Sequence, residues 1–136
     1  MLQQLVIGNA LKANASSTKG WVAGHFMPEG LGQTGDFEIK LWRYDEQPDY
    51  GQKTFGGTEF IIVERGALKL ELEVPNASGS FDSCMVELKG STRDYVILPP
   101  GCIKGVVVLE APSYGVTVRW PSVSGSNVVV KEKGQE

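Results

Sequence analysis

Apolar and polar residues alternate along two segments of the chain. In residues 36–44, apolar side chains at positions 37, 39 and 41 alternate with charged side chains at 36, 38 and 40. In residues 67–74, leucine or valine occupies every second position from 68, and lysine or glutamate lies between them. Alternation with a period of two is typical of a β-strand that has one buried face. Both segments are therefore predicted to be half-buried strands.

Shorter runs of β-branched and aromatic residues predict further strands. The run 59–63 is almost continuously apolar, which is typical of a strand covered on both faces. Tight turns are predicted at 64–66 and at 110–113, where glycine or proline interrupts the pattern. About eight short strands separated by turns are typical of an antiparallel sandwich or barrel. The additional strand segments are 20–27, 59–63, 81–88, 94–98, 103–109 and 114–120.

A length of 136 residues predicts one domain. Residues 20–122 carry the predicted strands and form the expected barrel. Residues 1–19 are expected to form an N-terminal arm, whose apolar positions line either a short helix or a segment along the barrel. Residues 123–136 are interpreted as a C-terminal tail or as an edge strand.

Composition narrows the expected partners and location. A hydrophobic fraction of 41% and a charged fraction of 21% are ordinary for a globular protein, and a net charge of −3 gives no electrostatic reason to expect nucleic acid. The sequence has no apolar run of about 18 residues and no basic, apolar leader, so we expect no membrane association and a cytoplasmic location. Cys84 and Cys102 lie far apart and are expected to be free thiols in a reducing compartment.

Two stretches resemble the sequence motifs of a known family. In the first, Glu59 is followed after six residues by Gly66, and in the second Pro99, Pro100 and Gly101 follow a predicted strand. These stretches resemble parts of the two motifs of the cupin superfamily of small antiparallel β-barrels. The resemblance implies an all-β fold, the cupin-type (RmlC-like) double-stranded β-helix or jelly-roll barrel. It also implies a homodimer, because isolated cupin barrels often pair through an outer sheet.

The metal-binding residues of cupins are largely replaced in this sequence. The resemblance places Lys53 and Phe55 at the family's paired histidines and Lys104 at its third histidine, while Glu59 is retained. Transition metals prefer imidazole, thiolate and carboxylate ligands, and the single histidine, His25, excludes a three-histidine site. We therefore expect no metal and no other cofactor. A site made of His25, Glu59 and one cysteine stays as an alternative.

Lys53 and Lys104 are expected to supply the positive charge that a buried Glu59 needs in place of a metal. Three interpretations of these lysines stay open. They form an ion pair that fills a disused site, or extend to solvent. Their surplus charge binds a small anion, such as a carboxylate or a phosphate. Or one lysine, with its pKa lowered by burial and by its neighbour, acts as a base or forms a Schiff base.

His25 and Arg119 each have two interpretations. His25 is either a half-buried histidine bonded to the backbone or a general base, with Tyr44 or Tyr95 as its partner. The second role resembles that of metal-free cupin epimerases, although their sequence signatures around the base are absent here. Arg119 either faces the pocket and binds an anion, or forms a surface or structural ion pair beside Glu38. We expect the ion pair.

The leading hypothesis is a metal-independent protein that binds a small molecule inside the barrel. The expected pocket consists of Lys53, Phe55, Glu59, Lys104 and His25. One alternative is a metal-free isomerase or lyase that acts on a sugar or small acid through His25 or a lysine. The other is a structural or regulatory dimerisation module with a vestigial pocket.

Overall fold

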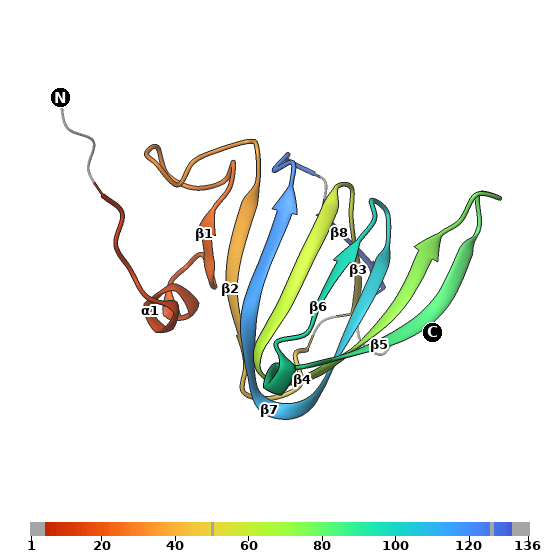
Figure 1. Cartoon of the computed structure of the whole chain (residues 1–136). Helices are drawn as coiled ribbons and strands as arrows, with labels where there is room; N and C mark the ends of the chain where they lie inside the picture. The colour runs from red at the N-terminus through yellow and green to blue at the C-terminus, as the bar shows by residue number, and fades with distance from the viewer. Residues whose placement is uncertain (1–4, 50, 126, 132–136) are drawn as a thin grey trace.

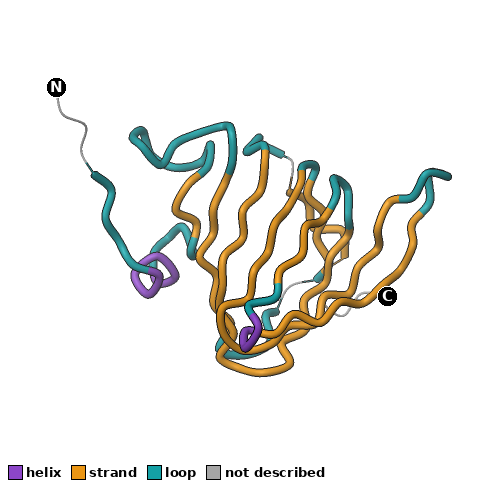
Figure 2. The backbone as a smooth tube through the Cα atoms, viewed as in Figure 1, coloured by secondary structure: helices purple, strands orange, loops and turns teal. Residues whose placement is uncertain are grey.

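The computed structural model describes residues 5–49, 51–125 and 127–131. They form a β-structure with one short α-helix and one turn of 3-10 helix (Figure 1, Figure 2). The helices are α1 (Ala10–Ala15) and η1 (Gly90–Thr92). The strands are β1 (Trp21–Ala23), β2 (Glu38–Tyr44), β3 (Gln52–Phe55), β4 (Thr58–Pro75), β5 (Phe81–Lys89), β6 (Tyr95–Leu98), β7 (Ile103–Trp120) and β8 (Asn127–Lys131).

Two long strands, β4 and β7, organise the whole molecule. Their ends pair with different neighbours, so the sheet divides into two curved halves that share these two strands (Figure 1). The first half has the strand order β1-β2-β7-β4-β6, and the second has the order β5-β4-β7-β3-β8. All of these pairings are antiparallel. The all-antiparallel architecture predicted from the sequence is confirmed.

The predicted turns at 64–66 and 110–113 are wrong, because β4 and β7 continue through both segments. Each strand bends there instead, and the pairing register shifts between Val63 and Leu68. Buried Ser113 holds the bend together: its hydroxyl accepts a hydrogen bond from the Ala67 amide at 3.0 Å. Gly66 has φ +84°, and an added Cβ would collide with Ser113. Glycine is therefore required at position 66, where the strand bends. In the sequence, a glycine that bends a strand looks like a glycine that ends one at a turn.

Other strand boundaries also differ from the prediction. The segment 20–27 contributes only the three-residue β1, so His25 lies in the turn that follows it. Residues 52–55 form β3, which the alternation pattern did not predict. Within the segment 123–136, residues 127–131 form β8, which pairs with β3 at the edge of the second half.

The apolar core lies between the two halves. The alternation in β4 is confirmed, because Leu68, Leu70 and Leu72 are buried. Cys102 is buried with them, Cys84 is exposed, and both thiols are free. None of the helices among the described residues has the length and apolar character needed to cross a membrane. The remaining buried core side chains are Trp42, Ile61, Val63, Leu88 and Leu98.

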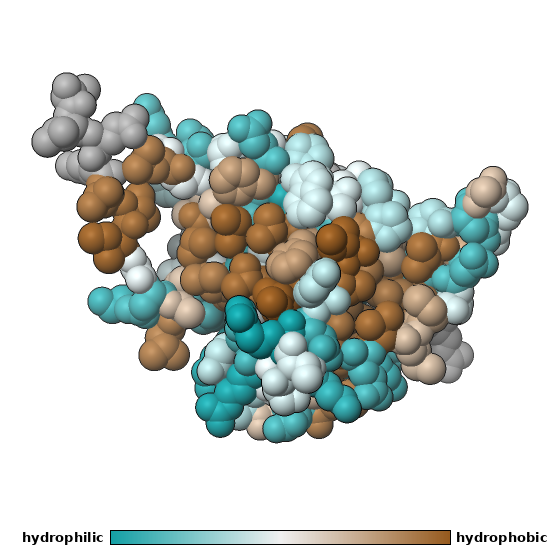
Figure 3. All heavy atoms as spheres, in the orientation of Figure 1, coloured by the Kyte–Doolittle hydropathy of each residue, from teal (hydrophilic) through white to brown (hydrophobic). Residues whose placement is uncertain are grey.

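Strand β2 turns its charged side inward at the open end of the barrel. Glu38 and Trp42 are buried, and Lys40 lies between them on the same face. The apolar side chains of Ile39 and Leu41 consequently lie on the outer face of the first half. Figure 3 shows hydrophobic residues gathered over this outer face. The exposed hydrophobic residues of β6 on it are Tyr95 and Ile97.

Candidate functional site

A row of alternating charges crosses three strands of the first half. Glu38 on β2 and Glu59 on β4 are both register partners of Arg119 on β7. The Arg119 Nε donates to Glu59 Oε2, and its Nη1 lies 3.4 Å from Glu38 Oε1. All three residues are buried. The expected ion pair between Arg119 and Glu38 is present, but it lies inside the barrel and not on the surface.

Lys104 reaches this row from the other half of the barrel. Its Nζ lies 2.7 Å from Glu59 Oε1, and the two side chains are 14% and 5% exposed. Burial alone would raise the pKa of Glu59, but Lys104 and Arg119 outweigh it and hold that pKa below its usual value. Glu59 is therefore ionised and engaged at both carboxylate oxygens.

Two aromatic rings enclose the Arg119 guanidinium. Its central carbon lies 5.1 Å from the Trp21 ring centroid and 5.0 Å from that of Phe55. These are cation–π distances, and they occur where the guanidinium is shielded from water. Phe55, which the family resemblance places at a histidine position, therefore packs against a cation.

Ser122 links His25 to Glu38. The Ser122 hydroxyl accepts from the His25 backbone amide at 2.9 Å and lies 2.7 Å from His25 Nδ1. It donates its only hydrogen to Glu38 Oε2 at 2.8 Å. The hydroxyl must therefore accept from Nδ1–H, which leaves Nε2 of the neutral ring with a free lone pair.

Two further lysines face the same interior. Lys53 pairs directly with Lys104 across β3 and β7, so both side chains lie on one face of the sheet. Lys40 Nζ lies 5.6 Å from the Trp21 ring centroid. Burial lowers the pKa of Lys40 to about 8, assisted by the charges of Lys53, Arg119 and Lys104 and partly opposed by Glu59. Lys40 is thus a partly buried amine beside three other cations.

Positive charge exceeds negative charge in this cluster. Among the described residues, Lys40, Lys53, Lys104 and Arg119 face two carboxylates, Glu38 and Glu59. A cavity of about 240 Å³ opens beside the row. It is lined by Trp21, His25, Phe26, Glu38, Arg119, Val123 and Gly125. We call the four cations and two carboxylates the charge cluster.

The charge cluster does not fit a divalent metal. Lysine ammonium groups and a phenyl ring occupy the positions that the family resemblance assigns to histidines, and Glu59 is already bound to two cations. Nowhere in residues 5–49, 51–125 and 127–131 do three or more His, Cys, Asp or Glu side chains gather in an arrangement that could hold a metal. A cation placed there would be repelled by its nearest side chains.

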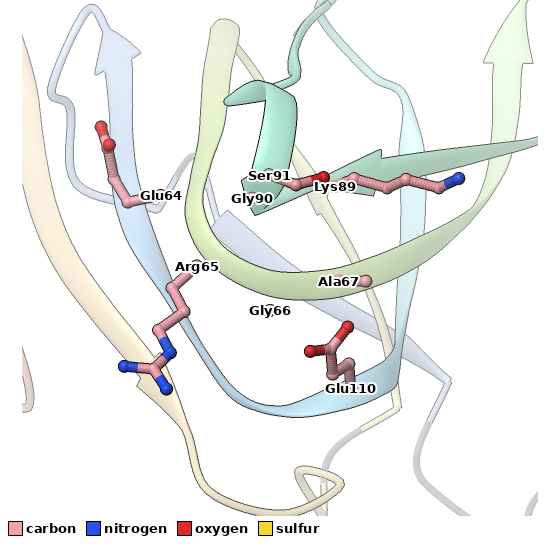
Figure 4. A pocket seen from close by; sticks show the side chains of 8 residues that line it. All are labelled: Glu64, Arg65, Gly66, Ala67, Lys89, Gly90, Ser91 and Glu110. Atoms are coloured by element: carbon pink, nitrogen blue, oxygen red, sulfur yellow. The ribbon is translucent and has the colours of Figure 1, made fainter.

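A second cavity, of about 500 Å³, lies at the bend of β4 and β7 (Figure 4). Arg65 and Lys89 there are accompanied by Glu64 and Glu110, so the charges balance. Glu64 is also paired with the exposed Arg93 at 2.7 Å. With balanced charge and open walls, this cavity is a weaker candidate site than the charge cluster.

The structure gathers most of the residues singled out from the sequence. Lys104 contacts Glu59 directly, Lys53 lies beside Lys104, and Phe55 reaches the cluster through Arg119. His25 is connected through Ser122 and Glu38. Neither tyrosine proposed as its partner takes that place: Tyr95 is 62% exposed on β6 and Tyr44 packs on Trp42.

Sequence reasoning missed Lys40 and Ser122 and did not identify the inward direction of Glu38. The alternation in β2 does show that Glu38 and Lys40 share a side with Trp42, the one large apolar residue there. That tryptophan was the available indication that the charged side faces the interior. Ser122 could not be found in this way, because its partner His25 lies 97 residues away.

Comparisons with known proteins identify the fold. No family model matches the chain, and no curated protein matches it. Among solved structures, the chain resembles the DMSP lyase DddQ of Ruegeria pomeroyi, with 10% identity and a TM-score of 0.62, over 98% of this chain and 64% of that one. It also resembles a Klebsiella pneumoniae protein with a double-stranded β-helix domain, with 14% identity and a TM-score of 0.56, over 95% and 100%.

A third similar structure is the dTDP-4-dehydrorhamnose 3,5-epimerase of Bacillus anthracis, with 18% identity and a TM-score of 0.56. That match covers 74% of this chain and 62% of the epimerase. The chain thus spans less than two-thirds of the lyase and of the epimerase. At these identities the likenesses show the fold alone, and the cupin-like double-stranded β-helix expected from the sequence is confirmed.

Proposed function

We propose that this chain, a cupin-like double-stranded β-helix, binds a small anion at its charge cluster without a metal. The observation that carries the proposal is an excess of positive charge that does not depend on Lys53. Lys40, Lys104 and Arg119 lie with only two carboxylates, Glu38 and Glu59, in the described part of the cluster. Buried charges without partners are costly, so an added anion would offset an existing penalty. A short carboxylate or a phosphate has the matching charge.

Lys40 gives the clearest indication of the missing negative charge. It is the cluster cation for which no carboxylate among the described residues lies within ion-pair distance, and its pKa is lowered to about 8. An anion about 4 Å away would contribute roughly 4 kcal/mol of attraction at an effective dielectric constant of about 20.

Isothermal titration calorimetry with inorganic phosphate, acetate and pyruvate at low salt tests this proposal. We expect at least one of these anions to bind, and Lys53→Met to weaken its binding about tenfold, or about 1.4 kcal/mol. Lys12→Met, at an exposed lysine of α1, is the matched control and should leave affinity unchanged. Absence of binding by all three anions, or equal affinity in both variants, would contradict the proposal.

A second candidate function is proton transfer in a metal-free isomerase or lyase. Ser122 directs the Nδ1–H of His25, so the lone pair of Nε2 is available as a base. His25 and Arg119 both line the cavity of about 240 Å³, where a negatively charged substrate would meet a base and a cation together.

Proton exchange in deuterated water tests this second function. Small oxo acids and sugars are incubated with the protein, and the loss of C–H signals beside the carbonyl group is followed by NMR. Exchange that disappears in His25→Gln but persists in Tyr95→Phe would support His25 as the base. Exchange that is unchanged in His25→Gln would eliminate it.

The homodimer implied by the family resemblance remains a proposal. It is supported by the apolar outer face of the first half, where Tyr95 and Ile97 are exposed. Light scattering on the intact chain should give twice the monomer mass, and Ile97→Glu should reduce it. A monomer at all concentrations would leave the third candidate, a dimerisation module, without support.

The free thiols of Cys84 and Cys102 support the cytoplasmic location that we propose.

A further inference from the structure

Lys40 occupies an unusual position for a lysine. It projects from the middle of β2 into the barrel, between buried Glu38 and buried Trp42. Its register partner on β7 is the buried Thr117, next to the row that contains Arg119. The side chain is partly buried, and no carboxylate among the described residues forms an ion pair with it. An inward-facing lysine without an ion-pair partner is uncommon.

The surroundings of Lys40 make its amine easier to deprotonate. Its Nζ lies over the face of Trp21, 5.6 Å from the ring centroid. The charges that act on its pKa are those of Lys53, Arg119, Lys104 and Glu59, and three of these four are positive. Burial and these cations lower its pKa to about 8. A partly buried amine next to other cations is an arrangement that activates a lysine as a nucleophile.

Lys104 lies in the same cluster as Lys40 but is not suited to act as a nucleophile. Its Nζ donates to Glu59 Oε1 at 2.7 Å, so the amine is already held in an ion pair. A nitrogen held in this way is not directed at a carbonyl carbon. Lys104 and Arg119 are thus suited to hold an anion, whereas Lys40 is suited to react.

We propose that Lys40 forms an imine with a small oxo acid whose carboxylate is held by Lys53, Lys104 and Arg119. This inference rests on the proposed anion site and adds a reactive group and a substrate class to it. A 2-oxo acid carries its carboxylate one bond from the carbonyl carbon. One compact molecule would therefore supply both the missing negative charge and an electrophile.

The chemistry needs no oxidant and no added cofactor. The neutral Lys40 Nζ attacks the carbonyl carbon, a C–N bond forms, and the carbonyl oxygen takes up a proton while the nitrogen loses one. The hydroxyl group of the resulting carbinolamine takes up a second proton, from solvent, and leaves as water when its C–O bond breaks. The nitrogen keeps its remaining hydrogen, so the product is a protonated imine. The imine nitrogen then withdraws electrons from the neighbouring carbon, which is the purpose of a Schiff-base lysine.

Borohydride trapping tests the proposal. The protein is incubated with pyruvate or glyoxylate at about pH 8, near the lowered pKa of Lys40, treated with cyanoborohydride and digested for peptide mapping by mass spectrometry. We expect one dominant adduct on the peptide that contains Lys40, at least tenfold above the adduct on exposed Lys12. Comparable labelling of Lys12 and Lys40 would overturn the proposal.

Two variants separate the imine from the anion site. Lys40→Arg keeps the positive charge but has no nucleophilic amine, so pyruvate should still bind in calorimetry while trapping is lost. Lys40→Met covers the case in which arginine does not fit. Lactate, which has the carboxylate but no carbonyl group, should bind to the wild type without giving an adduct.

The outcomes distinguish the two proposals. Binding of lactate and pyruvate without an adduct on Lys40 would overturn the imine and leave the anion site intact. Failure of both acids and of inorganic phosphate to bind would overturn the anion site itself. An adduct on Lys40 that is suppressed by excess lactate would support both together.

Discussion

Lys104 and Glu59 join the two halves of the barrel through an ion pair of 2.7 Å between Nζ and Oε1. They belong to different strands, and 45 residues of the chain separate them. In this fold, a carboxylate at the Glu59 position and a third histidine at the Lys104 position are what the family resemblance assigns to a metal. Here a fixed ammonium group makes the connection directly.

Glu59→Gln should destabilise the fold strongly. The substitution keeps the shape of the side chain but leaves Lys104 and Arg119 without their shared carboxylate, and removing one partner of a buried pair costs about 3–5 kcal/mol. Urea denaturation measures the free energy of unfolding. Glu71→Gln, at an exposed position of the same strand, should change it by less than about 0.5 kcal/mol. Equal effects would show that the Glu59 pairs contribute nothing.

Lys40→Met should stabilise the fold at pH 7 by about 2 kcal/mol, because it removes an unpaired buried charge and keeps the aliphatic stem. The folded-state pKa of Lys40, about 8, lies below its usual 10.5. Between these values the unfolded chain binds more protons, so rising pH increases the free energy of unfolding. The advantage of the variant should therefore shrink from pH 8 to pH 10.5. A constant difference would refute the lowered pKa.

Gly66→Ala should lower the stability of the fold more than Gly79→Ala does. The difference between the two variants measures the crowding at the bend. Both glycines have positive φ, at +84° and +82°, so both substitutions incur backbone strain of about 1 kcal/mol. Only at Gly66 would the new Cβ meet Ser113, whereas no atom lies within 4 Å of the position at Gly79. We expect an additional loss of about 2 kcal/mol for Gly66→Ala in thermal unfolding. Equal losses would contradict the close packing of the bend.

Ser122→Ala should change which tautomer the neutral His25 ring adopts. In the wild type, nitrogen NMR shifts of the ring should show hydrogen on Nδ1 and a lone pair on Nε2, because the Ser122 hydroxyl gives its hydrogen to Glu38. Without the hydroxyl, the neutral ring should shift toward the Nε2–H form. Ser80→Ala, in the exposed turn before β5, is the control and should leave the shifts unchanged. A wild-type ring with hydrogen on Nε2 would refute the assignment.

Local patterns predicted the fold because they report local geometry. The leucines of 67–74 alternate with charged residues, and this segment is indeed a half-buried strand. The stretch from Glu59 to Gly66 and the Pro99–Gly101 stretch indicated the architecture in another way, through their resemblance to the motifs of a known family. The bend at Gly66 was misread, since a glycine that ends a strand and a glycine that bends one have the same neighbours in sequence.

The candidate site was only partly predictable, because its orientation depends on contacts between distant segments. Alternation in β2 separates two faces but does not state which face is covered. Apolar Ile39 and Leu41 would ordinarily be placed inside, whereas here Glu38 and Lys40 face the interior. The cations of β7 and β3 settle the direction, and they become neighbours of Lys40 only in the folded chain.

The uninterrupted course of β4 and β7 has a consequence for how the molecule comes apart. Each strand spans 18 residues and supplies the centre of both halves, so loss of one half leaves the central strands of the other half continuing into unfolded chain. Amides on both sides of the bend should exchange with deuterium through one common opening event. The wall bearing Glu59 and the wall bearing Lys104 would thus melt as a single cooperative unit.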